Sequence, residues 1–150
     1  MNPTAVHWIN VLSHVCGAYW LWYAKWSTWP TWIMLCSLMA SCTMHISETK
    51  HGLDGMGYFA SISQVALNID RLFAVLLAIT CLCSSVFWND WILYTSIFGL
   101  LSICTILGEM TADLTQYVLL HTIWHIGVFF MAGRILVHTD RHQWITSRPM

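Results

Sequence analysis

Charged side chains are so sparse in this chain that long stretches of it contain none. Only 9% of the 150 residues are charged, whereas a typical soluble domain has about 25%. The uncharged stretches run through residues 1–24, 26–44, 72–89, 91–108 and 114–133. Each is close to the roughly 17–25 residues that a helix needs to cross a bilayer. The sequence therefore predicts a helical membrane protein, because the short apolar–polar alternation of a membrane barrel is missing.

The predicted fold is all-α, an integral membrane bundle forming a single transmembrane domain over residues 1–150. We place about five transmembrane helices at 5–25, 31–47, 67–88, 91–108 and 115–138. Pro30 suits the first turn of the second helix, where its missing N–H costs nothing. Asn89 and Asp90 form a polar turn between the third and fourth helices. The longest connection, 48–66, is rich in glycine and is the best candidate for a loop that folds over a site.

The distribution of basic residues predicts how the chain lies in the membrane. One predicted side carries more basic residues than the other, namely Lys25, Arg134, Arg141 and Arg148 against Lys50 and Arg71. The positive-inside rule then places the C-terminus in the cytosol and the opposite side, which holds the candidate site, in the lumen or outside the cell. The opening lacks a basic start, so we interpret it as a retained helix and not as a signal peptide.

The composition argues against several classes of function. A net charge of −1 gives no reason to expect a nucleic-acid partner. The six cysteines all lie in apolar segments without a C-x-x-C pair, which predicts small buried hydrophobes. Five helices make a thin wall around a polar site, which leaves room for a homo-oligomer.

The candidate site consists of ionisable and polar residues that interrupt this apolar background: Ser41, His45, Asp70, His121 and His125. His45 ends the second predicted helix, Asp70 begins the third, and the His121–His125 pair occupies the first turns of the last. Because consecutive helices cross the membrane in opposite directions, all of these residues are expected at one depth on one side of the membrane. Ionisable groups are costly in hydrocarbon and need partners there. A bound metal ion would satisfy them all at once.

The spacing of the histidines favours a catalytic metal site. Helix positions four apart share a face, so His121 and His125 can reach one ion, with His45 as the third ligand. Three protein ligands with one open position describe a catalytic Zn²⁺ site. Asp70 could accept a proton from a zinc-bound water or orient a ligand. Ser41, one turn before His45, could hydrogen-bond that water or a substrate oxygen.

Structural roles remain open for the same residues. His121 and His125 could be core histidines bonded to serine, threonine or backbone oxygens. Asp70 could pair with Arg71 or Lys50, although adjacent helix residues point about 100° apart and would pair poorly.

Other histidines provide a comparison. His138 and His142 have the same spacing, but a solvated interfacial face explains that pair better. We interpret His7 and His14 as helix-packing or interfacial residues, either of which could be a substitute ligand.

The pattern Ser-x3-His, then Asp, then His-x3-His resembles the CREST-type membrane hydrolase superfamily. This superfamily includes alkaline ceramidases, adiponectin-type receptors, post-GPI-attachment lipid remodelling proteins and myomaker-like proteins. The matching residues are Ser41 and His45 in "SCTMHI", Asp70 in "LNIDRLF", and His121 and His125 in "HTIWHIG".

The resemblance implies a zinc bound by the three histidines, assisted by Ser41 and Asp70, and hydrolysis of a lipid amide or ester. Members usually have seven spans. Removing two spans between the third and last helices keeps every motif residue on its side, so the chain resembles a shortened member.

Three functions follow as hypotheses. The first is a zinc-dependent, ceramidase-like lipid amidase or esterase whose partner is a membrane lipid substrate. The second is a non-enzymatic membrane protein, receptor-like or membrane-remodelling, that keeps the metal site. The third is a b-type haem protein that uses His14 with His45 or His121 as axial ligands.

Overall fold

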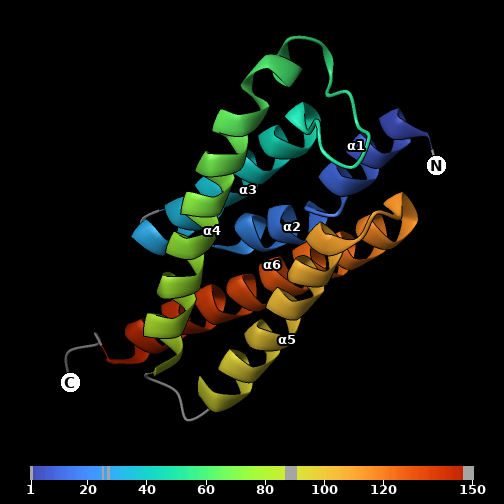
Figure 1. Cartoon of the computed structure of the whole chain (residues 1–150). Coiled ribbons are helices and arrows are strands. Elements are labelled where there is room, and N and C mark those ends of the chain that lie inside the picture. The colour runs from blue at the N-terminus through green and yellow to red at the C-terminus, as the bar shows by residue number, and fades with distance from the viewer. Residues whose placement is uncertain (1, 25, 27, 87–90, 147–150) are drawn as a thin grey trace.

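Helices form almost the whole of the described chain. The computed structural model describes residues 2–24, 26, 28–86 and 91–146, with side chains described up to residue 84 and from 91 to 137, and it contains no strand in these ranges. The elements are α1 (Pro3–Leu12), α2 (Val15–Tyr23), α3 (Trp29–Ser47), the 3-10 helix η1 (Gly57–Ile62), α4 (Ser63–Val86), α5 (Trp91–Met110) and α6 (Leu114–Thr146) (Figure 1). The all-α prediction is confirmed. The predicted turn at Asn89 and Asp90 lies outside the described residues.

The first predicted span is two helices and not one. α1 begins with Pro3 in its first turn, and the Asn2 side chain caps it by accepting from the Thr4 N–H at 2.9 Å. α1 ends at Leu12, where the Ser13 hydroxyl donates to the Asn10 carbonyl at 2.6 Å. A serine that bonds the backbone competes with the helical ladder, and α2 starts in a new direction after His14. The prediction of a continuous helix over 5–25 is therefore wrong.

Three helices among the described residues are long and apolar enough to cross a membrane. They are Gly57–Ser84, Trp91–Met110 and Leu114–Val137. α1 and α2 are too short individually, and the serine, threonine and histidine residues of α3 lower its mean hydropathy. These spans are consistent with a membrane protein, although they are fewer than the five predicted. Topology and sidedness stay predictions.

The helices pack as two antiparallel pairs with the N-terminal helices between them. α3 packs along α4, and α5 packs along α6, while α1 and α2 contact α3 and α6 (Figure 1). Leu21, Met34, Leu77 and Phe129 form part of the core where α2, α3, α4 and α6 meet. A side chain on Gly17 would collide with Leu38 and Phe129, so α2 approaches α3 and α6 at a glycine.

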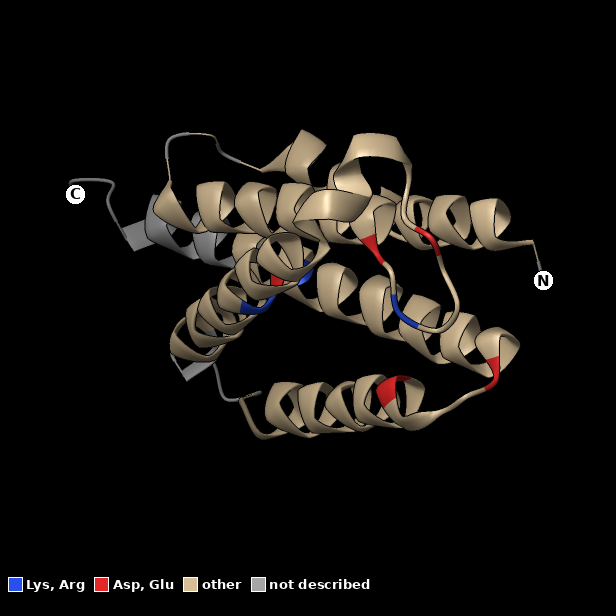
Figure 2. Cartoon of the chain, turned by 45° about the horizontal axis from the view of Figure 1, so that its top comes forward, with Lys and Arg blue, Asp and Glu red and all other residues tan. Residues whose placement is uncertain are grey.

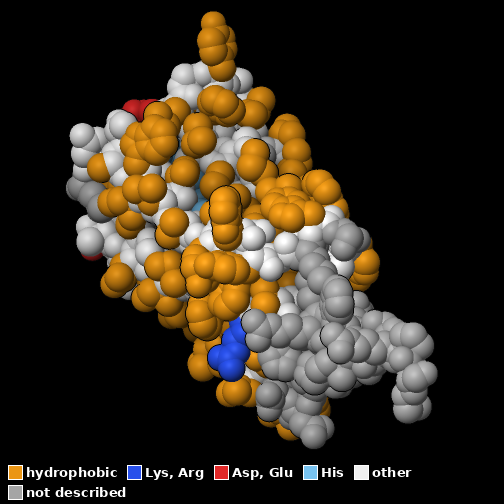
Figure 3. Space-filling model, turned by 180° about the vertical axis from the view of Figure 1, so that it is seen from behind, with side chains coloured by type: hydrophobic (Ala, Val, Ile, Leu, Met, Phe, Trp, Pro, Cys, Tyr) orange, Lys and Arg blue, Asp and Glu red, His pale blue; other side chains and the backbone are white. Residues whose placement is uncertain are grey.

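Many large hydrophobic side chains are exposed on the described surface. Hydrophobic side chains cover much of the described part of the face seen in Figure 3. Charged residues in the described part of the chain are few, and several lie around the loop after α3 and the α5–α6 connection (Figure 2). The six cysteines are free thiols, and Cys81 is buried whereas Cys83 is exposed, so the prediction that they are buried is wrong for Cys83.

The glycine-rich connection after α3 folds back on the bundle. Gly55 has φ +67°, and a Cβ there would lie 2.7 Å from the Ala60 Cβ, so glycine is required at this close approach. The Met56 N–H donates to the Ile46 carbonyl at 2.9 Å, and Leu53 is buried against Tyr117. The loop therefore covers the end of α3 where His45 lies. It is shorter than predicted, because η1 and α4 begin at residues 57 and 63.

Candidate metal centre

Three buried imidazoles from separate elements converge inside the bundle. His14 lies at the junction between α1 and α2, His45 in the last turn of α3, and His125 in α6. Their candidate ligand atoms all lie within 4.8 Å of one another. The Nε2 atoms of His45 and His125 are 2.9 Å apart, and the ring centroids of His14 and His125 are 4.0 Å apart. This cluster could bind a metal ion.

In the part of the chain that the structure describes, two ring nitrogens of the cluster lack a hydrogen-bond partner, and two others lie in contact with each other. His14 Nε2 and His125 Nδ1 are buried and have no hydrogen-bond partner among the described residues. Unpartnered buried polar atoms are rare and costly in proteins. Nitrogens bound to a tetrahedral Zn²⁺ at about 2.0–2.1 Å lie roughly 3.3 Å apart, close to the separation of the two Nε2 atoms. Neutral imidazoles suit zinc and neighbouring transition metals better than Mg²⁺ or Ca²⁺.

His121 lies beside the cluster, one turn before His125 on α6. Its ring centroid is 4.8 Å from that of His45 and 4.7 Å from that of His125. It is buried, and its Nδ1 also lacks a partner within the described part of the chain. The group with the closest ligand atoms nevertheless contains His14 and not His121. The structure thus brings together all three predicted ligands and adds a fourth imidazole.

Hydrogen bonds fix the orientation of two of these rings. His14 Nδ1 donates to the Asn10 carbonyl at 2.8 Å, and His45 Nδ1 lies 3.2 Å from Glu48 Oε2. A carbonyl or carboxylate partner holds the proton on Nδ1, which leaves the Nε2 lone pair for a metal. This arrangement of carboxylate, histidine and metal is common around bound zinc.

Glu48 is itself held in place by a second buried partner. The Tyr117 hydroxyl donates to Glu48 Oε1 at 2.5 Å, so the carboxylate bridges Tyr117 and His45. Burial raises the pKa of the Glu48 carboxyl, while the hydrogen bond from Tyr117 acts in the opposite direction. Glu48 was not among the site residues predicted from the sequence, although its position three residues after His45 places it on the same side of the helix end.

Glu48→Gln is expected to weaken metal binding by about 10–100-fold, the usual effect of removing an outer partner of a ligand. The glutamine amide can accept from only one of the two donors, and its NH₂ group then faces the other. Metal titration of the purified variant measures the loss. Glu109→Gln is the matched control, because Glu109 pairs with Lys50 at 3.0 Å and does not contact His45 by any described hydrogen bond. Equal affinities in the two variants would contradict a role for Glu48.

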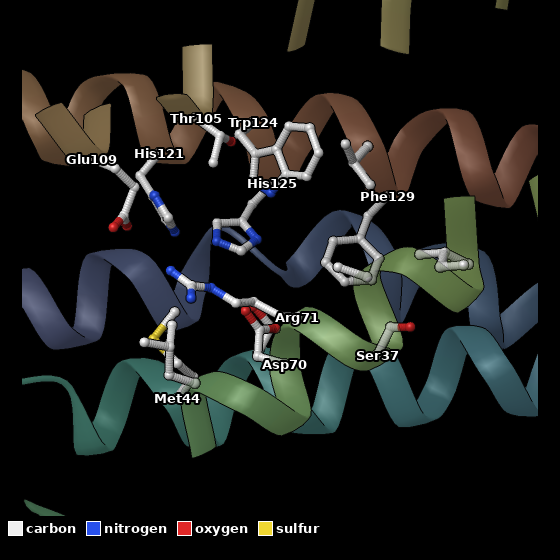
Figure 4. Close-up of a pocket in the computed structure, with 15 residues that line it drawn as sticks. Ser37, Met44, Asp70, Arg71, Thr105, Glu109, His121, Trp124, His125 and Phe129 are labelled. Carbon is white, nitrogen blue, oxygen red and sulfur yellow. The ribbon is translucent and has the colours of Figure 1, made fainter. Parts of the chain in front are cut away.

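A cavity of about 150 Å³ adjoins the histidines between α3, α4, α5 and α6. His121 and His125 line one wall from α6, and Asp70 and Arg71 line the facing wall from α4 (Figure 4). The half-buried Asp70 forms a side-chain hydrogen bond with Ser41, which also lines the cavity. The alternative pairing of Asp70 with Lys50 is wrong, because Lys50 pairs with Glu109.

The predicted site residues therefore meet, but in two parts. His45 and His125 belong to the closely spaced histidine cluster, whereas Ser41, Asp70 and His121 face the cavity. The histidine pair at 138 and 142 has side chains outside the described residues. No family model, curated protein or solved structure matches the chain.

Proposed function

We propose that this protein is a zinc-dependent membrane hydrolase that cleaves an amide or ester bond in a membrane lipid. The observation that supports the proposal most directly is the position of the buried histidine cluster. It adjoins a cavity whose opposite side carries a carboxylate hydrogen-bonded to a hydroxyl, Asp70 and Ser41. An apolar surface and three helices long enough to span a membrane support a lipid as substrate.

His45 and His125 hold the ion in this proposal, together with a third imidazole from the same cluster. Zinc bound there would lower the pKa of a water from about 15.7 to about 7 and polarise the lipid carbonyl. Glu48 keeps the His45 proton on Nδ1, so that Nε2 is free to bind.

Asp70 transfers the protons in this proposal, and Ser41 positions it. A carboxylate oxygen of Asp70 accepts the proton of the attacking water as the new C–O bond forms. The same carboxyl then returns that proton to the leaving amine or alcohol as the C–N or C–O bond breaks, so that protons balance. The Ser41 hydroxyl bonds to Asp70 and orients the carboxylate toward the cavity.

The remaining walls of the cavity are suited to the hydrocarbon next to a lipid carbonyl. Met44, Leu67, Leu77 and Val128 line it with apolar surface. Such walls limit the entry of water, which strengthens the electrostatic interactions of the few polar groups.

Metal analysis combined with a lipid hydrolysis screen tests the proposal. The purified full chain is expected to contain one zinc, to release fatty acid from at least one class of membrane lipid, and to lose that activity with a chelator. Adding zinc back should restore it. A wild-type protein that binds no metal at any zinc concentration tested would end the proposal.

A second candidate is a non-enzymatic membrane protein that keeps the metal site. The size of the cavity favours it, because 150 Å³ is below the roughly 300–1,000 Å³ of typical ligand pockets. Intact zinc binding without turnover on any lipid class would support this candidate. The imidazoles pack against one another, with His14 and His45 ring centroids 5.6 Å apart and His125 beside both, which favours a single ion over a haem.

A further inference from the structure

Two buried histidines compete for the third ligand position beside His45 and His125. His121 is the residue that the sequence pattern places there. His14 was predicted from the sequence only as a packing or interfacial residue that could be a substitute ligand, or as an axial ligand of a haem. Both have a ring nitrogen that lacks a hydrogen-bond partner in the described residues, namely His14 Nε2 and His121 Nδ1. The geometry distinguishes them.

His14 is oriented as a ligand before any ion binds. Its Nδ1 donates to the Asn10 carbonyl at 2.8 Å, so its only open nitrogen is Nε2. One ring nitrogen of His14 lies in the group of candidate ligand atoms within 4.8 Å of one another, with one each from His45 and His125. A hydrogen bond that fixes the ring and leaves the other nitrogen free is typical of metal-binding histidines.

The backbone around His14 also holds it rigidly toward α6. The break between α1 and α2 makes His14 the residue before the first turn of α2. One turn later, Gly17 lies so close to α3 and α6 that an added Cβ would come within 2.7 Å of Leu38 and 2.8 Å of Phe129. This tight packing brings the His14 ring within 4.0 Å of the His125 ring.

His121 is placed differently. It lies on the cavity wall together with Glu109 and Asp70, and Figure 4 shows its ring pointing into that space. Its Nδ1 has no described hydrogen bond to fix the ring. Its ring packs against those of Tyr117, His45 and His125. A side chain that faces a cavity with an unpartnered nitrogen is available to a molecule bound in that cavity.

We propose that the metal ion is bound by His14, His45 and His125, and that His121 stands outside the ligand set and hydrogen-bonds the substrate from the cavity wall. The substrate contact rests on the proposed function, whereas the ligand assignment does not. The ligand set would take Zn²⁺ or a similar transition ion. The fourth position of a tetrahedral site would remain open toward the cavity that His125 lines.

Metal titration of paired variants tests the ligand assignment. The full chain in detergent is stripped with a chelator and titrated with Co²⁺ followed by its visible absorption, and then with Zn²⁺ in competition. His14→Ala is expected to lower the affinity by at least about 100-fold, beyond the effect of an outer partner. His121→Ala is expected to change it by no more than about twofold, because His121 supplies no ligand nitrogen. The Co²⁺ spectrum of His121→Ala should match that of the wild type.

The fold of each metal-free variant is checked by circular dichroism and by its Tm. If His14→Ala is unfolded, His14→Gln fills a similar volume and replaces it in the titration. A loss in His121→Ala equal to or larger than the loss in the His14 variant would overturn the assignment. If that happens while the wild type binds zinc and hydrolyses lipid, only this inference fails. A wild type that binds no metal overturns both this inference and the proposed function.

Discussion

His45→Ala is expected to abolish metal binding in the micromolar range and to remove zinc-dependent turnover with it. The His45 ring lies near all three other imidazoles of the site, with centroid distances of 5.6 Å to His14, 4.8 Å to His121 and 4.9 Å to His125. It also belongs to the group of candidate ligand atoms that lie within 4.8 Å of one another. The loss should exceed the roughly 10–100-fold effect of removing an outer partner. The variant also leaves the buried Glu48 carboxyl without its imidazole partner.

Zinc content per chain and isothermal titration measure the effect, and His7→Ala is the matched control. His7 is another buried histidine close to His45, and its Nδ1 bonds the His45 carbonyl at 2.5 Å. The His7→Ala substitution removes a side chain of the same size as His45 but takes no ligand nitrogen from the cluster. His7→Ala is expected to keep its zinc. A His45→Ala protein that retains full zinc content would show that the cluster is a packing feature.

The meeting of the candidate residues was predictable because it depends on topology. His45 ends one helix, Asp70 lies near the start of the helix that follows the loop, and His121 and His125 lie near the start of the last helix. Alternate crossing of the bundle brings these ends together, and it does so despite errors of several residues in the helix boundaries. The i, i+4 spacing likewise placed His121 and His125 on neighbouring turns of α6.

The part that could not be predicted depends on a local break in the backbone. In an uninterrupted helix over 5–25, the direction of the His14 side chain would follow the same helical repeat as its neighbours. Instead, the Ser13 hydroxyl bonds the Asn10 carbonyl and α1 ends, so His14 enters the interior beside His125. A lone serine in an apolar run is too common to signal a break. Glu48 was predictable from its spacing to His45, but the hydrogen bond from Tyr117 joins residues 69 positions apart.

Among the described residues, three helices meet the length and hydropathy expected of a membrane span, whereas five spans were predicted. Counting uncharged residues treats serine, threonine and histidine as apolar, and α3 contains several of each of the hydroxyl residues. These residues face the interior in places, as the buried Ser37 and Ser41 show. A helix that lines a polar site needs such residues whether or not it crosses a membrane.

Asp70→Asn is expected to lower lipid hydrolysis by about 10²–10⁴-fold while the zinc content stays that of the wild type. The asparagine amide keeps the size of the carboxyl and can still bond Ser41, but it cannot accept a proton from water. Asp70 lines the cavity opposite His125 and is not one of the closely spaced cluster residues, so its loss should not release the ion. Asp54→Asn, an exposed aspartate in the loop after α3, is the control and should keep its activity.

Ser41→Ala tests the role of the Ser41 hydroxyl in the same way, and Ser37→Ala is its matched control. Both serines line the cavity, but the Ser37 hydroxyl donates to the backbone carbonyls of Ile33 and Phe73, at 2.9 Å and 3.0 Å. Only Ser41 bonds the Asp70 carboxylate, so only Ser41→Ala should reduce the turnover number. If Asp70→Asn keeps full activity, proton transfer does not pass through this carboxylate. If the Asp70→Asn protein also loses its zinc, the proposed role of Asp70 in proton transfer is contradicted. Asp70 then supports the metal ligands, because only such a residue would change the zinc content.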